Sequence, residues 1–268
     1  MKIFILNSSG NVGKSLISRE LFYPRLDNCK IIEVETVNRG SKELKHLNVE
    51  QFKTGDDFMN IYLQLMEIEN IIVDVGASNL AGFWEQMNDY TGIEDMFDLF
   101  VIPVTSGDKE MTDTYKTILF LREQGIPEEK IKVIFNRVKK SVENEFAVLL
   151  SADFSFNTNC FIKESSLFKD LGLMKQTISD IYNEDIDSYK KQILEEKSPQ
   201  KKLLLVKKDL ANRMAVKIKR DFDELVSCLT DYEPKQEPRE QKKKEKVQEV
   251  KEVEKETENE ISEDDEEL

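Results

Sequence analysis

Histidine and cysteine are scarce in this chain, and their scarcity excludes several kinds of site. Among 268 residues there is one histidine, His46, and there are three cysteines, Cys29, Cys160 and Cys228, which lie far apart and form no C-x-x-C pair. A structural zinc site or a disulfide framework needs more ligands at closer spacing. We therefore expect reduced cysteines, and Ser-His-Asp chemistry has little support.

Long apolar runs are also missing. No segment approaches the roughly 18 consecutive apolar residues that a membrane-spanning helix needs. Lys2 is followed by only four apolar residues, fewer than the apolar core of a signal peptide. The sequence therefore predicts a cytoplasmic protein with no membrane span.

Negative charge predominates, but it is unevenly distributed along the chain. The formal net charge is −14, and residues 233–268 hold 15 acidic and 8 basic residues, which is half of that net charge. Because this segment has almost no apolar residues, it cannot build a core. We expect it to be a disordered charged tail.

The most informative segment that is present is a glycine-containing loop near the N-terminus. It follows a short apolar run, Lys2–Leu6, and ends in Gly13-Lys14-Ser15, after which Leu16–Phe22 has helical apolar spacing. Backbone N–H groups of such a loop and of the helix N-terminus can bind phosphate, the lysine adds positive charge, and the serine hydroxyl can ligate Mg²⁺. Ser8 replaces the first glycine of the usual G-x-x-x-x-G-K-[ST] pattern.

Further short apolar runs alternate with helical patterns along the body of the chain. The expected strands are 30–35, 70–76, 97–104, 132–137 and a weaker one at 160–162, and the expected helices include 58–67 and 113–124. Strands that alternate with helices indicate βαβ units, and apolar runs without alternation indicate strands buried on both faces. We therefore expect an α/β fold with a mostly parallel, doubly wound sheet.

Polar residues recur where these expected strands end. Glu33 and Glu35, Asp74 and Asn136 all share this position with the N-terminal loop. Ligands of open α/β sheets bind at the carboxyl ends of the strands. Two alternatives remain open at this point: the two glutamates could be solvated charges of an edge strand, and Asn136 could cap a turn.

The pattern changes after Asp180. A short helix is expected at 181–196, followed from Pro199 by one long helix. Its apolar stripe is Leu203, Leu210, Met214, Ile218, Phe222, Leu225 and Leu229. Between Lys197 and Arg220 nine basic residues accompany one acid, Asp209, so this face is either solvated surface or a contact for a polyanion. We expect three parts: a domain at 1–183, a basic helical extension at 184–232 and the tail at 233–268.

Five segments together resemble the ParA/MinD group of P-loop ATPases, and most of all the StbB-type plasmid-stability proteins. They are Asn7–Ser15, Glu33–Asn38, Val73–Gly76, Phe135–Arg137 and Ile162–Phe168. The resemblance covers most of residues 1 to about 183. It implies a P-loop NTPase fold with ATP and Mg²⁺ as ligands.

The resemblance also implies roles for individual residues. Nucleotide would be bound by Ser9, Gly10, Asn11, Val12, Gly13, Lys14, Ser15, Leu16 and Asn136, the last reading adenine. Lys14 would hold the β- and γ-phosphates, Ser15 and Asp74 would serve the metal, and Glu35 would position the attacking water. Lys14, Glu35 and Asp74 would thus be the catalytic set.

This sequence departs from the ParA pattern in two ways. Ser9 stands where these proteins have a signature lysine, and Glu33 and Glu35 replace the usual pair of aspartates. Without that lysine, charge in the transition state is less well neutralised. The resemblance therefore supports ATP binding more firmly than hydrolysis.

The function implied is a nucleotide-dependent switch in plasmid or mobile-element stability, partition or transfer. It would be a slow ATPase that forms a homodimer with ATP, with DNA or a DNA-bound adaptor protein as partner through Lys197–Arg220. Two alternatives remain. One is an ATP-binding adaptor with impaired hydrolysis, consistent with Ser8 and Ser9, and the other is an ATP-dependent metabolic ligase on the same fold.

Overall fold

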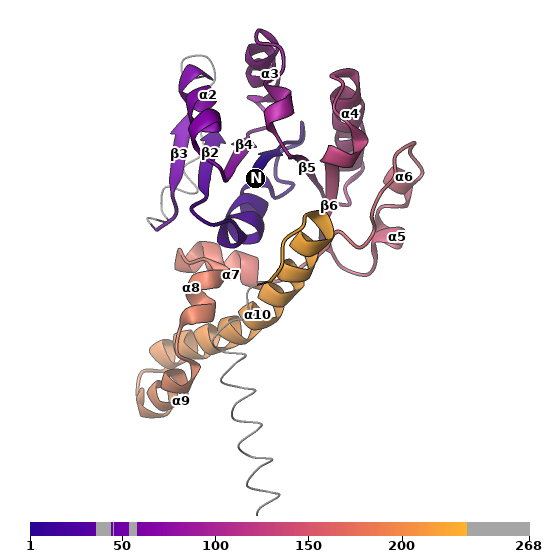
Figure 1. The fold of residues 1–268 in the computed structure, drawn as a ribbon. Helices are drawn as coiled ribbons and strands as arrows, with labels where there is room; N and C mark the ends of the chain where they lie inside the picture. The colour runs from indigo at the N-terminus through magenta and orange to yellow at the C-terminus, as the bar shows by residue number, and fades with distance from the viewer. Residues whose placement is uncertain (36–43, 45, 54–57, 235–268) are drawn as a thin grey trace, which may run out of the picture. The chain divides into compact units, whose positions relative to one another are not determined.

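A computed structural model describes residues 1–35, 44, 46–53 and 58–234 (Figure 1). Residues 36–38 of the second resembling segment lie outside the described residues, as does the expected tail from residue 235 onward. Met1–Tyr232 form one compact unit. The expected boundary at residue 183 stays a prediction.

Seven strands form one parallel sheet, in the order β3-β2-β4-β1-β5-β6-β7. They are β1 (Lys2–Ile5), β2 (Lys30–Val34), β3 (Val49–Phe52), β4 (Ile71–Val75), β5 (Leu99–Val104), β6 (Ile131–Val138) and β7 (Phe161–Lys163). The expected parallel sheet is confirmed. Because β1 lies between β4 and β5, the loop that follows it is at the centre of the carboxyl edge, where ligands of such sheets bind.

Helices cover both faces of the sheet, as doubly wound folds require (Figure 1). One face carries α2 (Phe58–Glu67), α3 (Leu80–Asn88), α4 (Asp108–Glu123), α5 (Val142–Glu145) and α6 (Ala147–Leu150). The other carries the π-helix η1 (Ile17–Phe22), α7 (Leu167–Met174), α8 (Ile178–Asn183) and α10 (Pro199–Leu229). The remaining helical segments are α1 (Lys14–Leu16), η2 (Tyr23–Arg25), η3 (Glu94–Met96), η4 (Glu128–Lys130) and α9 (Ile186–Glu195).

The alternation of side chains along β1 explains why a helical layer packs on each face of the sheet. Successive side chains of a strand point to opposite faces. Phe4 therefore packs among the aromatic rings of Phe83, Trp84 and Phe100 on one face, and Ile5 joins the core on the other. The sheet is buried on both sides, which accounts for the unbroken apolar runs of its strands.

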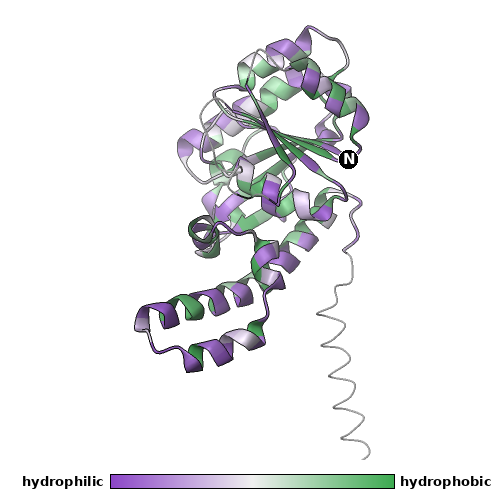
Figure 2. Cartoon of the chain, turned by 90° about the vertical axis from the view of Figure 1, so that its left-hand side faces the viewer, coloured by the Kyte–Doolittle hydropathy of each residue, from purple (hydrophilic) through white to green (hydrophobic). Residues whose placement is uncertain are grey.

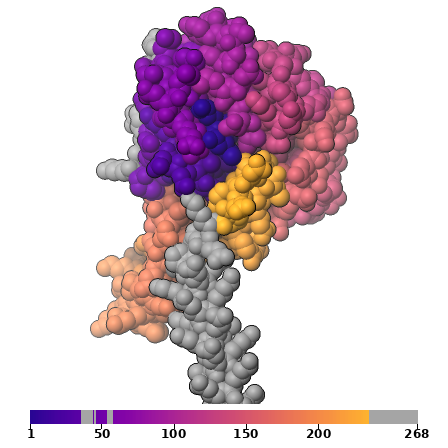
Figure 3. Space-filling model, in the orientation of Figure 1, coloured from indigo at the N-terminus to yellow at the C-terminus, as the bar shows by residue number. Residues whose placement is uncertain are grey.

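The long helix α10 is anchored to the body by its C-terminal half. Its buried residues are Ala211, Asn212, Ala215, Phe222, Leu225, Val226 and Leu229, and this end lies against the body of the fold (Figure 3). Leu203 and Leu210, which belong to the apolar stripe named from the sequence, are 59% and 53% exposed. They lie on the part of α10 that forms a hairpin with α9 and extends away from the sheet (Figure 2).

Three further details differ from the sequence-based expectations. Strand β3 was not expected, the helix expected at 181–196 is divided into α8 and α9, and α4 begins at Asp108 instead of residue 113. The division coincides with Asp185, whose side chain accepts a hydrogen bond from the Asp187 N–H and so caps α9. None of the described helices is long and apolar enough to cross a membrane.

Candidate functional site

The loop after β1 is fixed at its start by Asn7, which is completely buried. Its amide donates to the Pro103 carbonyl and to Thr114 Oγ1, both at 2.8 Å, and its Oδ1 accepts from the Ser9 N–H at 2.7 Å. Ser8 Oγ lies 3.3 Å from the Asp113 carbonyl oxygen on α4. The loop is therefore tied to β5 and α4 before it turns back over β1.

Two residues with positive φ give the loop its shape: Asn11 at 58° and Gly13 at 101°. At Gly13 the glycine is required, because a Cβ there would lie 2.2 Å from Nδ2 of Asn136. That same nitrogen donates to the Val12 carbonyl at 2.8 Å. Asn136, at the end of β6, thus holds the back of the loop.

Lys14 is buried, and its charged group faces the loop. Its Nζ donates to the carbonyls of Ser9 at 3.0 Å and Asn7 at 3.3 Å. Burial lowers the pKa of Lys14, and the nearby carboxylates of Asp74 and Glu35 oppose that shift. The arrangement keeps a positive charge at the loop in little contact with water.

Asp74, near the end of β4, is the buried acid beside this lysine. Its Oδ2 accepts from Ser18 Oγ at 2.9 Å. Burial, opposed by the hydrogen bond from Ser18, raises the pKa of Asp74 to about 6, and the nearby Glu33, its register partner on β2, acts in the same direction as burial. Lys14 and Ser15 act in the opposite direction. The site therefore contains a buried acid whose pKa lies well above that of an exposed aspartate.

The two glutamates of β2 occupy different environments. Glu33 is 6% exposed and accepts a hydrogen bond from Gln51 Nε2 of β3 at 2.8 Å. Glu35 follows the strand and packs on Gly76, where an added Cβ would lie 3.0 Å from Glu35 Cγ. Of the two, Glu35 is the one that reaches the loop's cavity.

A cavity of about 430 Å³ opens on this loop. Its lining residues are Gly10, Asn11, Gly13, Lys14, Ser15, Leu16, Glu35, Gly76, Ala77, Ser78, Asn79 and Arg137. Ser9, Val12, Asp74 and Asn136 are buried behind this lining. The residues expected to bind nucleotide therefore lie close together, some in the wall of the cavity and the others buried behind it.

The side chains present fit a nucleotide phosphate and Mg²⁺. The cavity volume is within the range of small-ligand sites. Ser9 Oγ is buried without a hydrogen-bond partner among the described residues, so the start of the loop has an unused polar group. No cluster of three or more His, Cys, Asp or Glu in the described part of the chain could hold a metal. Ser15 and Asp74 would thus share Mg²⁺ with phosphate and water oxygens, as is usual for this ion.

Several residues of the site were given no role from the sequence, among them Asn7, Ser18 and Arg137. A signal existed for two of them, since Asn7 is a polar residue directly after an apolar run and Ser18 lies one helical turn beyond Lys14. Arg137 lines the cavity from the end of β6 with a φ of 60°. That backbone conformation has no sequence signal in an arginine.

Comparisons with known proteins find structural likeness only. No family profile matches the sequence, and no curated protein matches it. MinD of Aquifex aeolicus, in a complex with MinC, is 17% identical over 80% of this chain and 95% of that one, with a TM-score of 0.46. MinD of Pyrococcus horikoshii, complexed with Mg-ADP, is 14% identical over 85% and 98%, with a TM-score of 0.46.

A third solved structure is the ATP complex of a point variant of McdA from Cyanothece. It is 14% identical over 81% of this chain and 96% of that one, with a TM-score of 0.42. Because all three TM-scores are below 0.5, the assignment of the fold depends on the strand order and on the loop between β1 and α1. These define a doubly wound, parallel α/β fold with a glycine-containing loop between its central strand and the helix that follows.

Proposed function

We propose that this chain is a P-loop ATPase of the ParA/MinD type, most like StbB-type proteins, that binds ATP with Mg²⁺. The observation that supports this most is the buried Lys14, whose ammonium group contacts loop carbonyls at the wall of the cavity. A buried cation needs a strong counter-charge. Phosphate would supply it where Asp74 and Glu35 only partly do.

Each residue of the site has a task in this proposal. Lys14 and the loop N–H groups bind the phosphates, and Ser15 and Asp74 hold Mg²⁺ with Ser18 orienting Asp74. Glu35 orients the attacking water. Bound Mg²⁺ would offset the charge that develops on the phosphate oxygens.

The same site can act as a switch. The Gly76 N–H and the Asn79 amide both donate to the Val34 carbonyl, at 3.0 and 3.2 Å. The segment 76–79 is thus bonded to β2, lines the cavity and leads directly into α3, so a nucleotide that contacts it would bias the position of that helix. We infer a nucleotide-dependent homodimer in the cytoplasm that serves plasmid or mobile-element stability, partition or transfer.

The second candidate function is an ATP-binding adaptor that does not hydrolyse ATP efficiently. It is favoured by Ser9, whose buried hydroxyl stands where a lysine would reach the phosphates of a partner subunit. DNA or a DNA-bound adaptor would be the partner in either case, through the basic residues of Lys197–Arg220.

Phosphate release with and without DNA tests the proposal. We expect slow release by the wild type, faster release by Ser9→Lys, and a larger loss with Glu35→Ala than with Glu33→Ala, because Glu35 reaches the cavity. This assignment would be contradicted if Ser9→Lys left the rate of phosphate release unchanged. It would also be contradicted if Glu33→Ala lowered that rate more than Glu35→Ala. ATP binding without release would favour the adaptor.

A further inference from the structure

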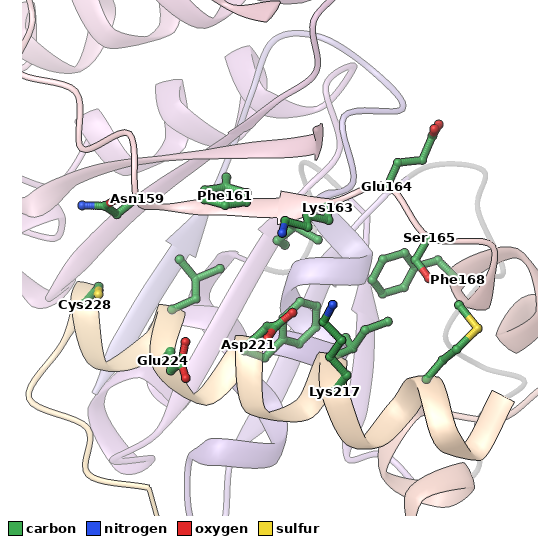
Figure 4. Close-up of a pocket in the computed structure, with 15 residues that line it drawn as sticks. Asn159, Phe161, Lys163, Glu164, Ser165, Phe168, Lys217, Asp221, Glu224 and Cys228 are labelled. Atoms are coloured by element: carbon green, nitrogen blue, oxygen red, sulfur yellow. The ribbon is translucent and has the colours of Figure 1, made fainter. Parts of the chain in front are cut away.

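A second cavity, which shares no lining residue with the loop's cavity, lies between the last described strand and the last described helix. It is a groove of about 520 Å³ bounded by β7 on one side and the C-terminal half of α10 on the other (Figure 4). Strand β7 ends the strand order, and no described strand pairs with its outer edge. The groove thus exposes a free sheet edge beside a helix.

The free edge offers main-chain groups for pairing. The Cys160 carbonyl accepts from the Phe135 N–H, and the Glu164 N–H donates to the Val138 carbonyl, both at 3.0 Å. Because backbone groups alternate in direction along a strand, the Phe161 carbonyl and the Lys163 N–H point away from β6. That pair of groups matches what one residue of an added parallel strand would bind.

The floor of the groove is apolar. Ile162, Phe222 and Leu225 are 3%, 3% and 4% exposed, and the rings of Phe168 and Phe222 stack with centroids 6.2 Å apart. Met214 and Ile218 are partly buried and complete the lining on α10. Such a floor accepts apolar side chains of moderate size.

The rim carries five charged side chains: Lys163 and Glu164 from the end of the strand, and Lys217, Asp221 and Glu224 from the helix (Figure 4). Glu164 lies 3.9 Å from Lys139. The other four form no ion pair with a residue in the described ranges, and Nζ of Lys163 lies 5.9 Å from the centroid of the Phe161 ring. Elsewhere on α10, however, Arg213 pairs with Asp209 at 2.9 Å and Lys219 pairs with Asp223 at 3.7 Å. These four rim charges are therefore available to an approaching chain.

We propose that this groove binds an extended peptide segment of a partner protein, which adds to β7 as a further strand. Main-chain bonds to Phe161 and Lys163 give affinity, and alternate side chains of the peptide enter the apolar floor. A lysine or arginine of the peptide faces Asp221 and Glu224, and an acidic residue faces Lys163 and Lys217. This binding is separate from the proposed nucleotide site and does not depend on it.

A second copy of the chain fits the edge less well. Strand β7 has only three residues, and two such edges paired symmetrically about Ile162 would place each Lys163 opposite Phe161 of the other copy. That arrangement gives the Lys163 charge no acidic partner. A heterologous peptide can carry the opposite charge.

The test is a selection of phage-displayed random peptides on the immobilised full-length protein, followed by titration of the best synthetic peptide. We expect alternating apolar residues with one basic residue among those enriched. The affinity of this peptide should fall about tenfold or more in the Asp221→Lys/Glu224→Lys variant, since charge pairs at such rims set specificity. Glu123→Lys, an exposed reversal on α4, should leave the affinity unchanged.

A second measurement leaves the protein unaltered. The same peptide with alternate backbone amides N-methylated should lose binding, because a methylated amide cannot donate to the Phe161 carbonyl. Failure to enrich any peptide on the wild-type protein, or equal binding of the methylated peptide, would overturn the proposal. So would a dimer in sedimentation analysis that Lys163→Pro dissociates, since the occupant would then be a second copy.

Discussion

Two buried charges of opposite sign set the properties of the loop site. Lys14 is 8% exposed and Asp74 is 3% exposed, and burial shifts both pKa values toward the neutral form. Each charge costs free energy to bury and is only partly compensated by the other. We interpret this as stability given up for ligand binding, a usual trade at functional sites.

The Asp74→Asn variant tests whether the buried charge of Asp74 lowers the stability of the fold. Burial raises the pKa of Asp74 from 3.8 to about 6, so the folded state favours the protonated acid. That stabilising contribution is complete below pH 3.8 and is lost as the pH rises through about 6. The variant, neutral at every pH, should therefore exceed the wild type in free energy of unfolding by up to about 3 kcal/mol at neutral pH.

Urea unfolding across a pH series measures the difference, with Asp89→Asn on the exposed surface as control. We expect the gain of Asp74→Asn to disappear at acid pH and its phosphate release to be lost. A variant less stable than the wild type at neutral pH would show that the Asp74 charge is a net stabiliser.

The residues of the loop differ in how far their placement follows from the sequence. The spacing of Gly13, Lys14 and Ser15 after an apolar run was enough to locate the cavity's wall. The role of Asn136 as a brace for Val12 was not predictable, because it depends on the approach of β6 to the loop. The local sequence pattern identifies the loop, whereas the residues that hold the loop in place come from strands that are distant in the sequence.

At the scale of elements, Arg25 connects the segment after the loop to α10. Its guanidinium donates to Asp223 Oδ1 at 2.8 Å, to the Leu21 carbonyl at 2.8 Å and to the Lys219 carbonyl at 2.9 Å. The Arg25 side chain is 4% exposed. One side chain thus joins the end of η1 to the anchored half of the long helix.

We expect Arg25→Met to lower the free energy of unfolding by about 3 kcal/mol, because it removes one donor from a partly buried carboxylate and from three carbonyls. Arg213→Met is the control, since it removes an exposed pair within α10. Denaturant unfolding compares the two. Equal effects would mean that Arg25 is not a structural tie.

The basic residues of α10 do not all have the same surroundings, as the sequence had suggested they would. Lys208 pairs with Glu184 at 3.8 Å and Lys219 with Asp223 at 3.7 Å, so both lie toward the body. Lys202, Arg213 and Arg220 are exposed and, spaced 11 and 7 residues apart, share one outer face. These three are the best candidates for a phosphate backbone.

If they contact DNA, affinity should fall with salt by about 0.9 logarithmic units per phosphate, which gives a log–log slope near −2.7 for three contacts. Reversal of all three to Glu should abolish the slope, and reversal of Lys109, Lys116 and Lys169 should not. Fluorescence anisotropy with ATP present measures both. If reversal of Lys202, Arg213 and Arg220 leaves DNA binding unchanged, the DNA contact belongs to a partner protein.

The sequence predicted those helices and strands whose apolar residues form a continuous run or a regular helical spacing. Helix α2 was expected with its observed bounds, and six of the seven strands were expected to within a few residues. Strand β3, with Glu50 and Gln51 at its centre, lies at the sheet edge and has no apolar run. The exposure of Leu203 and Leu210 could not be predicted, because their helical spacing says nothing about where α10 leaves the body.

For the whole molecule, the order of the strands decides the function. The sequence predicted parallel strands but not their order, which follows from long-range pairing such as that of β1 with both β4 and β5. That order brings the ends of β1, β2, β4 and β6 to one cavity. Residues as distant in sequence as Gly10 and Arg137 therefore form one candidate site for Mg-ATP.

The most direct test is calorimetric titration of Mg-ATP into the wild type, Lys14→Ala and the control Lys116→Ala, with circular dichroism to verify the fold. The account predicts that the wild type and the control bind with the same affinity and that Lys14→Ala is folded but produces no binding heat. Equal affinity of the wild type and Lys14→Ala would contradict it, as would a wild type that does not bind Mg-ATP.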